Sequence, residues 1–232
     1  MCGRYTSTTA PADLAQLFAV DEIKAEPLDP SWNVAPTQDV YAIAERRGAR
    51  QLGTFRWGLV PSWAKNPSVG AKMINARAEG LATKPAYRSA LSRRRCIIPA
   101  DGFYEWQVVK GGPKPVKQPY AIRHRDGSPL AFAGLWEVWR DPTTPEGDLL
   151  RTCAIITTAA NELLAPLHDR MPVVLPPDTW ATWLDRDGQD SAAVAPFLVA
   201  ARASEFELWP VSTLVNRALA NGPELWEPRY DS

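Results

Sequence analysis

Proline is the residue that most restricts the fold of this chain, because 22 of the 232 residues are prolines. Each proline lacks a backbone N–H and fixes φ at about −65°, so it interrupts helices and rarely occurs in the middle of a sheet. The prolines therefore predict many turns and short elements in place of long helices. Hydrophobic residues make up 45% of the chain, which is enough to bury a core and excludes whole-chain disorder.

Local sequence patterns predict mostly short strands. A helix is expected over residues 11–18, with Pro11 near its first turn, and residues 40–44 and 51–57 are expected to form a hairpin. Further strands are predicted at 95–99, 103–109, 119–124, 130–139, 150–157 and 205–211, with a Gly-Gly-Pro-Lys-Pro turn after 103–109. Helical segments are predicted at 77–92 (broken at Pro85), 160–166, 177–184 and 190–200.

The order of these elements predicts the fold class. Strands follow one another like hairpins, and the helices are inserted between groups of strands, which favours α+β over a doubly wound parallel sheet. We expect a curved, largely antiparallel sheet or an open barrel flanked by short helices. No internal repeat, low-complexity tract or long linker divides the sequence, so a single domain is expected over residues 1–232.

Several classes of protein are disfavoured by simple counts. The sequence has no run of ~18 apolar residues and no secretory signal pattern, so we expect no membrane span and a cytoplasmic protein, nucleoid-associated in a prokaryote. Its three scattered cysteines and two histidines argue against a disulfide scaffold or a structural zinc site. No metal and no cofactor are expected.

Charge is unevenly divided along a chain whose formal net charge is zero. Residues 1–95 carry 14 Lys or Arg and 8 Asp or Glu, a net charge of +6, and residues 96–232 carry the opposite net charge of −6. One interpretation is a basic face on a neutral protein. The alternative is that the two halves neutralise each other across an interface.

Cys2 is the first candidate for chemistry. Because Cys is small, removal of the initiator methionine is expected, and the mature chain would then begin with both an amine and a thiol. Their ordinary pKa values of about 7.7–8.0 and 8.5 leave appreciable neutral amine near pH 7. A 1,2-aminothiol traps aldehydes, because the amine forms an imine and the thiol closes a thiazolidine ring on the same carbon. The alternative is an incidental, buried cysteine.

Three polar side chains elsewhere are candidates for positioning and proton transfer. Asn75 precedes Arg77 at an expected strand-to-helix junction, and its alternative role is a helix cap. Glu105 shares a strand face with Phe103 and Gln107, where partial burial would raise its pKa; the alternative is a water-facing edge residue. His168 could transfer protons at neutral pH, with Asp169 and Arg170 orienting it or binding phosphate; the alternative is a loop histidine with a local ion pair.

A last group combines aromatic residues and prolines with nearby Arg and Lys. It includes the segments Trp32–Pro36 and Trp57–Lys65, which suit stacking on unpaired bases beside phosphates. Most tryptophans belong to cores, so core packing is the alternative for each.

The combination and order of these motifs resemble one family. The motifs are Met-Cys-Gly-Arg-Tyr at the start, Asn33–Pro36, Trp57–Pro61, Asn75–Glu79, Cys96–Trp106 and His168–Pro172. Together they resemble the SRAP family, the SOS-response-associated peptidases or abasic-site-processing proteins. The resemblance extends from Cys2 to Asn216.

The resemblance implies a function and a role for each matching residue. The protein would bind single-stranded DNA containing an abasic site, and the mature Cys2 would form a thiazolidine crosslink with the sugar aldehyde. It also implies a peptidase activity that removes Met1, leaves a lyase-type activity open, and suggests a monomer. The implied catalytic residues are Cys2, Asn75, Glu105 and His168; the implied DNA-binding residues are Arg4, Asn33, Pro36, Trp63, Arg77 and Arg170. Ala64 departs from the family, which often has a second aromatic there.

Two other functions stay open at this point. Met-Cys-Gly also begins the glutaminase domains of class II amidotransferases, but those need an Arg-Trp-Ala-Thr-His-Gly type of segment that this sequence lacks. A non-catalytic single-strand binder with an incidental Cys2 is the second alternative. An adduct with abasic DNA that depends on Cys2 would separate these possibilities from the first.

Overall fold

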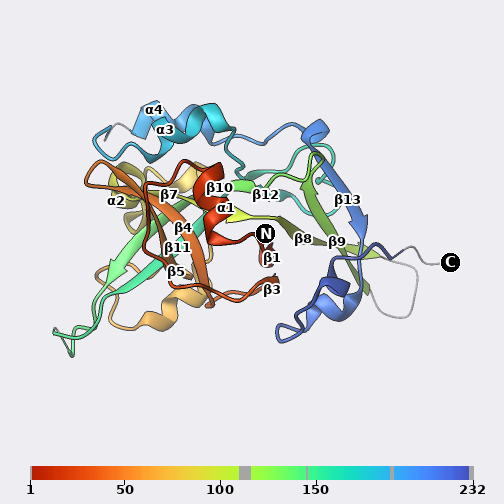
Figure 1. Cartoon of the computed structure of the whole chain (residues 1–232), viewed down its shortest axis with the longest axis horizontal. Helices are drawn as coiled ribbons and strands as arrows, with labels where there is room; N and C mark the ends of the chain where they lie inside the picture. The colour runs from red at the N-terminus through yellow and green to blue at the C-terminus, as the bar shows by residue number, and fades with distance from the viewer. Residues whose placement is uncertain (1, 110–115, 145, 189–190, 230–232) are drawn as a thin grey trace.

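Antiparallel strand pairing organises most of the chain. The computed structural model of the protein describes residues 2–109, 116–144, 146–188 and 191–229. It contains two sheets, which lie side by side in Figure 1 with the N-terminus near their junction.

Five strands of the larger sheet form a ring. They are β4 (Asp39–Arg46), β5 (Ala49–Trp57), β7 (Arg95–Ala100), β10 (Leu130–Trp139) and β11 (Leu150–Ala159). Antiparallel pairing runs from β5 through β4, β7 and β10 to β11. Strand β11 then pairs in parallel with β5, where Thr152 lies opposite Arg56. The pairings therefore close a barrel, on the left in Figure 1.

Three short strands extend this ring. Strand β2 (Glu22–Ile23) pairs with β5, β6 (Asn75–Arg77) pairs with β11 in parallel, and β12 (Arg170–Pro172) pairs with β11 in the antiparallel sense. The smaller sheet has the order β13 (Phe206–Pro210), β9 (Val116–His124), β8 (Gly102–Val109), β1 (Tyr5–Ser7) and β3 (Ser31–Val34), with every pairing antiparallel.

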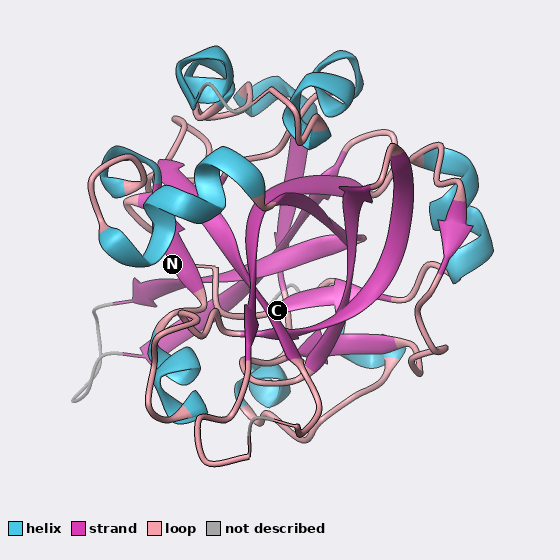
Figure 2. Cartoon of the chain, turned by 90° about the vertical axis from the view of Figure 1, so that its left-hand side faces the viewer, coloured by secondary structure: helices cyan, strands magenta, loops and turns pink. Residues whose placement is uncertain are grey.

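Helices lie on the outside of the barrel (Figure 2). The α-helices are α1 (Pro11–Leu17), α2 (Pro85–Arg93), α3 (Trp180–Leu184) and α4 (Ser191–Val194). The 3₁₀ segments are η1 (Pro67–Lys72), η2 (Ala78–Gly80), η3 (Pro177–Thr179), η4 (Ala195–Phe197), η5 (Ala203–Glu205), η6 (Thr213–Asn216) and η7 (Pro223–Leu225). Pro11 and Pro85 begin α1 and α2, a position where proline's missing N–H removes no helical hydrogen bond.

Side-chain alternation separates two apolar layers. On β11, Ala154 and Ile156 pack with side chains from the four helices, whereas Cys153 and Ile155 pack in a second cluster. Because residues of a barrel strand alternate between inside and outside, the second cluster fills the barrel interior. That cluster also includes Phe103 and Phe206 of the smaller sheet, so both sheets share one core. The predicted single α+β domain with a largely antiparallel, curved sheet is confirmed.

Most predicted elements are present, but the helix predicted at 160–166 is wrong and the one predicted at 77–92 is confirmed only from Pro85 onward. Residues 160–166 form hydrogen-bonded turns in place of a helix: Asn161 caps a first turn, and Pro166 has no N–H with which to continue it. The predicted helix at 77–92 begins only at Pro85, because Asn75–Arg77 pair with β11 as β6. The predicted turn at 111–115 and the end of the predicted domain at 230–232 lie outside the described residues.

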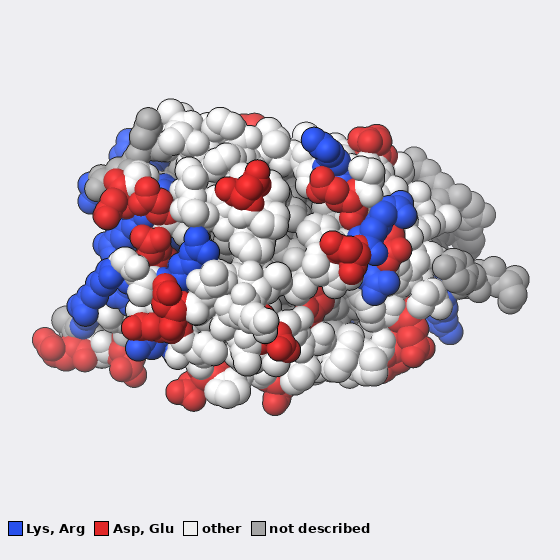
Figure 3. All heavy atoms as spheres, turned by 45° about the horizontal axis from the view of Figure 1, so that its top comes forward, with Lys and Arg blue, Asp and Glu red and all other residues white. Residues whose placement is uncertain are grey.

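Charges of both signs lie interleaved on the face shown in Figure 3, gathered toward its two ends with a mostly uncharged band between them. This face therefore carries no purely basic patch. Among the described residues, no helix is long and apolar enough to span a membrane.

Arg95 is a buried cation, 4% exposed, that joins α2 and α3 to the barrel. Its guanidinium donates hydrogen bonds to backbone carbonyls of Leu91, Ser92, Trp183, Asp185 and Gly188. Its neighbours in sequence have other environments: Arg93 is exposed, and Arg94 pairs with Glu137 at 2.7 Å. The three consecutive arginines therefore have three roles: Arg93 is a surface charge and Arg94 forms an ion pair. Arg95 is a clamp, meaning a buried cation that holds α2 and α3 through their backbone carbonyls.

We expect Arg95→Leu to lower the free energy of unfolding by about 3 kcal/mol, because it leaves several buried carbonyls without donors. Arg93→Leu is the matched control and should change stability by less than about 0.5 kcal/mol. Urea unfolding followed by tryptophan fluorescence measures both. Equal effects of the two substitutions would contradict the clamp.

Candidate active site at the N-terminal strand

The register of β1 brings the N-terminus to β8. Tyr5 lies opposite Phe103 and Thr6 opposite Gly102, and the N–H of Tyr104 donates to the carbonyl of Arg4. Because the strands are antiparallel, moving backward from Tyr5 along β1 corresponds to moving forward from Phe103 along β8. This register puts Gly3 at the level of Glu105 and Cys2 one residue further along, and the electrostatic effect of Glu105 on the Cys2 thiol shows that the two side chains are close.

Asp101 fixes the other end of β1. Its carboxylate accepts hydrogen bonds from the backbone N–H and hydroxyl groups of both Thr8 and Thr9, including one of 2.8 Å from Thr8 Oγ1. Asp101 is not among the residues predicted from the sequence. The signal that could have identified it is a carboxylate directly before a strand that begins with Gly102.

Asn75 holds the backbone of Cys2. Its Nδ2 donates to the Cys2 carbonyl at 2.8 Å, across 73 residues of sequence. The alternative role as a helix cap does not apply, since Arg77 occupies the cap of η2. Within the described chain, the buried Oδ1 of Asn75 has no hydrogen-bond partner. Such an acceptor costs about 1–3 kcal/mol unless a further donor reaches it.

Glu105 is 2% exposed and lies on the same face of β8 as Phe103. Burial raises the pKa of this carboxyl, and His168 is close enough to oppose that rise electrostatically. Burial also raises the pKa of the Cys2 thiol strongly, and the charge of Glu105 raises it further. The Cys2 thiol and the Glu105 carboxyl therefore interact electrostatically, and the environment of each favours its protonated form. The expected burial of Glu105 is observed, and β8 is not an edge strand.

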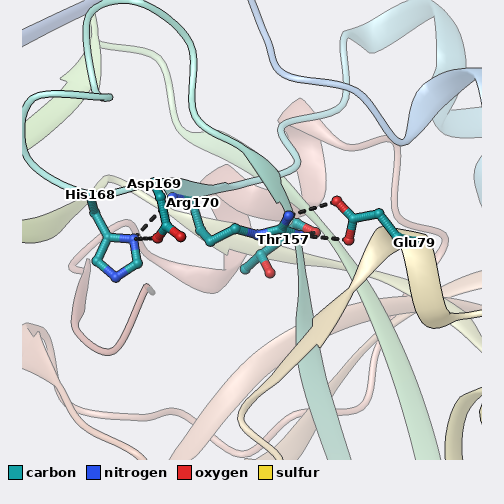
Figure 4. Close-up of polar contacts among 5 residues, drawn as sticks. All are labelled: Glu79, Thr157, His168, Asp169 and Arg170. Carbon is teal, nitrogen blue, oxygen red and sulfur yellow. Dashed lines mark hydrogen bonds and ion pairs between the residues drawn. The ribbon is translucent and has the colours of Figure 1, made fainter.

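His168 lies partly exposed at the end of the turn before β12. Its Nδ1 accepts the backbone N–H of Arg170 at 2.9 Å and lies 2.7 Å from Asp169 Oδ1 (Figure 4). These contacts belong to different protonation states, because Nδ1 must be unprotonated to accept and protonated to donate. The contact with the Arg170 N–H fits a ring whose proton is on Nε2, and the contact with Asp169 fits a ring protonated on Nδ1.

Arg170 points away from His168 and is paired within the chain. Its guanidinium donates to both carboxylate oxygens of Glu79, at 2.6 and 3.0 Å, and to the Thr157 carbonyl at 2.6 Å (Figure 4). Arg170 and Arg77 together lower the pKa of Glu79. The pair ties β12 to the segment after β6, and so fixes the separation between His168 and Asn75.

Arg4 and Asn33 join the N-terminal strands to the C-terminal segment. Arg4 Nη1 donates to Asn33 Oδ1 at 3.0 Å and to the Val215 carbonyl at 2.8 Å. Asn33 is 2% exposed, and its amide donates to carbonyls of Val215, Arg217 and Ala220. This environment favours a structural role for Asn33, and DNA binding by either residue stays a prediction.

The remaining predicted DNA-binding residues lie on the surface. Trp63 is 68% exposed, Arg77 is exposed and Pro36 is partly exposed. Ala64 is buried, and its carbonyl accepts the indole N–H of Trp139 at 2.7 Å. Position 64 therefore faces the core, and Trp63 is the aromatic side chain of this loop that solvent reaches.

Cys2 itself is 0% exposed, contrary to the expectation of a reachable thiol. The side chain packs in the apolar cluster that fills the barrel interior, with Tyr5 and Phe103 among its members. Packed side chains therefore separate the Cys2 thiol from solvent.

Comparison with known proteins identifies the family. The family model "SOS response associated peptidase (SRAP)" matches residues 1–218. The chain is 44% identical to the abasic site processing protein YoqW of Bacillus subtilis, over 98% of this chain and 99% of that protein. It is 33% identical to YedK of Escherichia coli, over 98% and 100% of the two chains, and 31% identical to HMCES of Gallus gallus, over 98% and 78%.

Solved structures have the same fold. A protein from Bacteroides thetaiotaomicron superposes with a TM-score of 0.85 at 24% identity, covering 99% of this chain and all of the other. A phage-related protein from Bordetella bronchiseptica gives a TM-score of 0.70 at 30% identity, covering 90% and 94%. The family match over residues 1–218 and the full-length relatives together establish that this chain belongs to the SOS response associated peptidase (SRAP) family.

Proposed function

We propose that the protein processes abasic sites in single-stranded DNA, and that Cys2, once Met1 is removed, captures the lesion as a thiazolidine. The observation that carries this proposal is the convergence of Asn75 and Glu105 on Cys2 from separate strands. The names of YoqW, YedK and HMCES as abasic site processing proteins support the substrate class.

The chemistry follows from the groups at hand. The neutral Cys2 amine adds to the aldehyde carbon of the opened sugar and gives a carbinolamine. Loss of one water forms the imine, and the thiol sulfur then adds to the same carbon while its proton passes to the ring nitrogen. The balance is one aldehyde and one aminothiol giving one thiazolidine and one water. A thiol with a raised pKa stays protonated, which favours attack by the amine before attack by the sulfur.

Glu105 and Asn75 have separate parts in this scheme. Dehydration of the carbinolamine needs an acid, and a carboxyl with a raised pKa remains protonated at higher pH than an ordinary one. Asn75 holds the Cys2 carbonyl, which orients the amine and the thiol, and its unpartnered Oδ1 can accept a sugar hydroxyl. His168 exchanges protons with the sugar oxygen when the ring opens or the crosslink reverses.

The surface residues complete the proposal. Arg77 supplies a charge for the DNA phosphates, and the exposed ring of Trp63 suits stacking on a base next to the lesion, with Pro36 as the second part of the wedge. Arg4 and Arg170 remain proposed phosphate contacts. Arg170 would need to exchange its Glu79 partner for a phosphate, and Asn33 would act by holding Arg4.

The proposal includes the finer activities that the family name suggests. Hydrolysis of the bond between Met1 and Cys2 is the peptidase step, and it must precede crosslinking. A lyase-type cleavage of the DNA would follow from an imine that loses the 3′-phosphate before the ring closes. We place a monomer acting in the cytoplasm, on nucleoid DNA of a prokaryotic cell during the SOS response.

Cys2→Ala should abolish a heat-stable adduct with abasic single-stranded DNA. Cys153→Ala is the matched control, because Cys153 is an equally buried thiol with a raised pKa and should leave the adduct yield unchanged. Intact-mass spectrometry before and after mixing reports both Met1 removal and the adduct, whose mass should equal the sum of both molecules less one water. An adduct that survives Cys2→Ala would exclude this mechanism. Ammonia release from glutamine without an adduct would favour the amidohydrolase.

Adding one residue between Met1 and Cys2 should abolish the adduct without altering the fold. If the added residue is retained, the nitrogen of Cys2 is part of a peptide bond and cannot form an imine. The thiol without that imine cannot close the thiazolidine ring. Circular dichroism and thermal unfolding serve as the fold control, and intact mass shows which residue begins the chain. A full yield of adduct from an extended chain would contradict the role of the amine.

Glu105→Gln should slow crosslinking by about 100-fold while DNA affinity stays within a few fold, because it removes the acid and leaves the surface contacts. It should also stabilise the fold near pH 7. The pKa of Glu105 is raised on folding, so the native chain retains a proton that the unfolded chain loses, and stability declines as pH rises above the ordinary carboxyl value. Glutamine does not titrate, so the variant does not lose stability in this way as the pH rises.

Unfolding of the unaltered chain and of Glu105→Gln at pH 4 and pH 7.5 tests the effect on stability. The gain in free energy of unfolding from Glu105→Gln should be larger at pH 7.5. Loss of DNA binding together with stability would instead make Glu105 a structural residue. His168→Ala should likewise slow crosslinking or its reversal more than it weakens binding.

A further inference from the structure

A hollow lies at one mouth of the barrel, beside the β4–β5 hairpin and the start of β11. It encloses about 300 Å³, at the lower end of the range of about 300–1,000 Å³ for small-ligand sites, which commonly occupy barrel mouths. Its lining residues are Lys24, Ala44, Arg46, Arg47, Gln51, Gly53, Phe55, Trp136 and Arg151.

Small residues on the inner face of the barrel create this hollow. Gln51, Gly53 and Phe55 alternate with outward-facing Leu52 along β5, and Ala44 lies opposite Gln51 on β4. A side chain at position 53 would begin 3.2 Å from the Phe55 ring. Large apolar residues fill the deeper interior, but glycine and alanine leave the last layer at this mouth open.

The rim is strongly basic. Arg46, Arg47 and Arg151 are exposed, and their guanidinium groups have no ion pair or hydrogen bond to another described residue. Lys24 differs, because Glu22 neutralises it at 3.2 Å, and Gln51 also donates to Glu22. Three guanidinium groups without an ion pair to a described residue therefore line one cavity, and Arg47 also lines a neighbouring hollow that contains Glu45 and Asp187. Guanidinium forks are well suited to the oxygens of a phosphate.

The hairpin places one of these arginines in an uncommon backbone conformation. Arg47 has φ +54° and Gly48 has φ +75°, the pattern of a two-residue hairpin turn whose first position favours Asn, Asp or Gly. An arginine at positive φ costs local stability that an asparagine would not. Arg47 therefore occupies the rim although its backbone conformation disfavours arginine. This backbone feature is separate from the shape of the cavity.

The floor of the hollow is aromatic and polar. Phe55 and Trp136 meet edge to face with ring centroids 5.8 Å apart, and 6% and 7% of the two residues remain exposed. The Gln51 amide lines the same wall. A ligand with a compact ring and one phosphate would place the ring against these groups and the phosphate among the arginines.

This hollow is separate from the Cys2 site. Arg151, Cys153 and Ile155 point to the same side of β11, and Ile155 pairs with Asn75. Arg151 and Ile155 are four residues apart, roughly 13 Å at about 3.3 Å per strand residue. The fully buried Trp57 and Cys153 lie in the core between the two ends.

We propose that this barrel mouth binds a mononucleotide-sized phosphorylated ligand, with Arg46, Arg47 and Arg151 on the phosphate. The same chemistry is presented by a free nucleotide and by the phosphorylated end of a DNA strand. The proposal does not depend on thiazolidine chemistry at Cys2.

The test uses titration calorimetry with dAMP, deoxyadenosine, inorganic phosphate, and a short oligonucleotide with or without a 5′-phosphate. The variant is Arg47→Gly combined with Arg151→Gln. Glycine suits the positive φ at position 47, so the guanidinium is removed without harming the hairpin. Arg88→Gln is the control, because Arg88 is an exposed arginine of α2 that does not line the cavity.

We expect dAMP to bind the unaltered chain at least tenfold more tightly than deoxyadenosine or phosphate. The double variant should lose at least tenfold in dAMP affinity, and Arg88→Gln should stay within about twofold. Competition by the 5′-phosphorylated oligonucleotide, but not by the unphosphorylated one, would assign the site to strand ends. Binding of dAMP without such competition would assign it to free nucleotides.

Equal dAMP affinities for the double variant and Arg88→Gln, or no binding by the unaltered chain, would overturn the proposal. Crosslinking to abasic DNA should continue in the double variant. Its loss together with dAMP binding, in a chain that still unfolds cooperatively, would show that the hollow is not a separate site. Failure of the nucleotide site thus has a different signature from failure of the Cys2 chemistry.

Discussion

Pairing of β1 with β8 is the constraint on which the candidate site depends. A short N-terminal segment has little structure of its own, yet here it is an inner strand with β3 on one side and β8 on the other. Asp101 fixes the residues after it, and Arg4 connects it to the C-terminal segment. The register of β1 sets where the preceding residues lie, and it leaves Cys2 close to Glu105. A shift of one residue would turn the side chains of this segment toward the opposite face of the sheet.

Strand β11 plays the corresponding part on the other side of the site. Near its end Thr157 lies opposite Arg77 of β6 and Pro172 of β12, so one strand carries both neighbouring segments. The Arg170–Glu79 pair then joins those segments directly. This arrangement brings Asn75 and His168 into one site from positions 93 residues apart in the sequence. Burial of Glu105 there costs stability, and the same burial raises the pKa of the carboxyl, which the proposed acid step uses.

Much of the strand content could be predicted from the sequence, because β4, β5, β10 and β11 are long enough for apolar periodicity and flanking turns to mark them. Strands β1, β3, β6 and β12 have only three or four residues each, and none was predicted with its bounds; β6 was expected only as the strand side of the junction at Asn75. Segments of that length carry no measurable periodicity, and they are strands only because a neighbouring strand pairs with them. The expected helix at 160–166 failed for a local reason, since Pro166 stops the helix after one turn.

Some properties of the candidate residues could likewise be predicted from the sequence, and others could not. Alternation along 103–107 placed Glu105 on an apolar face, and the structure agrees. No local pattern predicts that Asn33 is buried against three carbonyls, that Arg170 is paired with Glu79, or that Ala44 and Gly53 leave a basic hollow open. By itself, the sequence determined the chemistry available, a run of strands too often interrupted for long helices, and a cysteine next to the start. Only the tertiary structure decided which of these groups meet, because strand register and barrel closure join residues far apart along the chain, and local preference does not specify either.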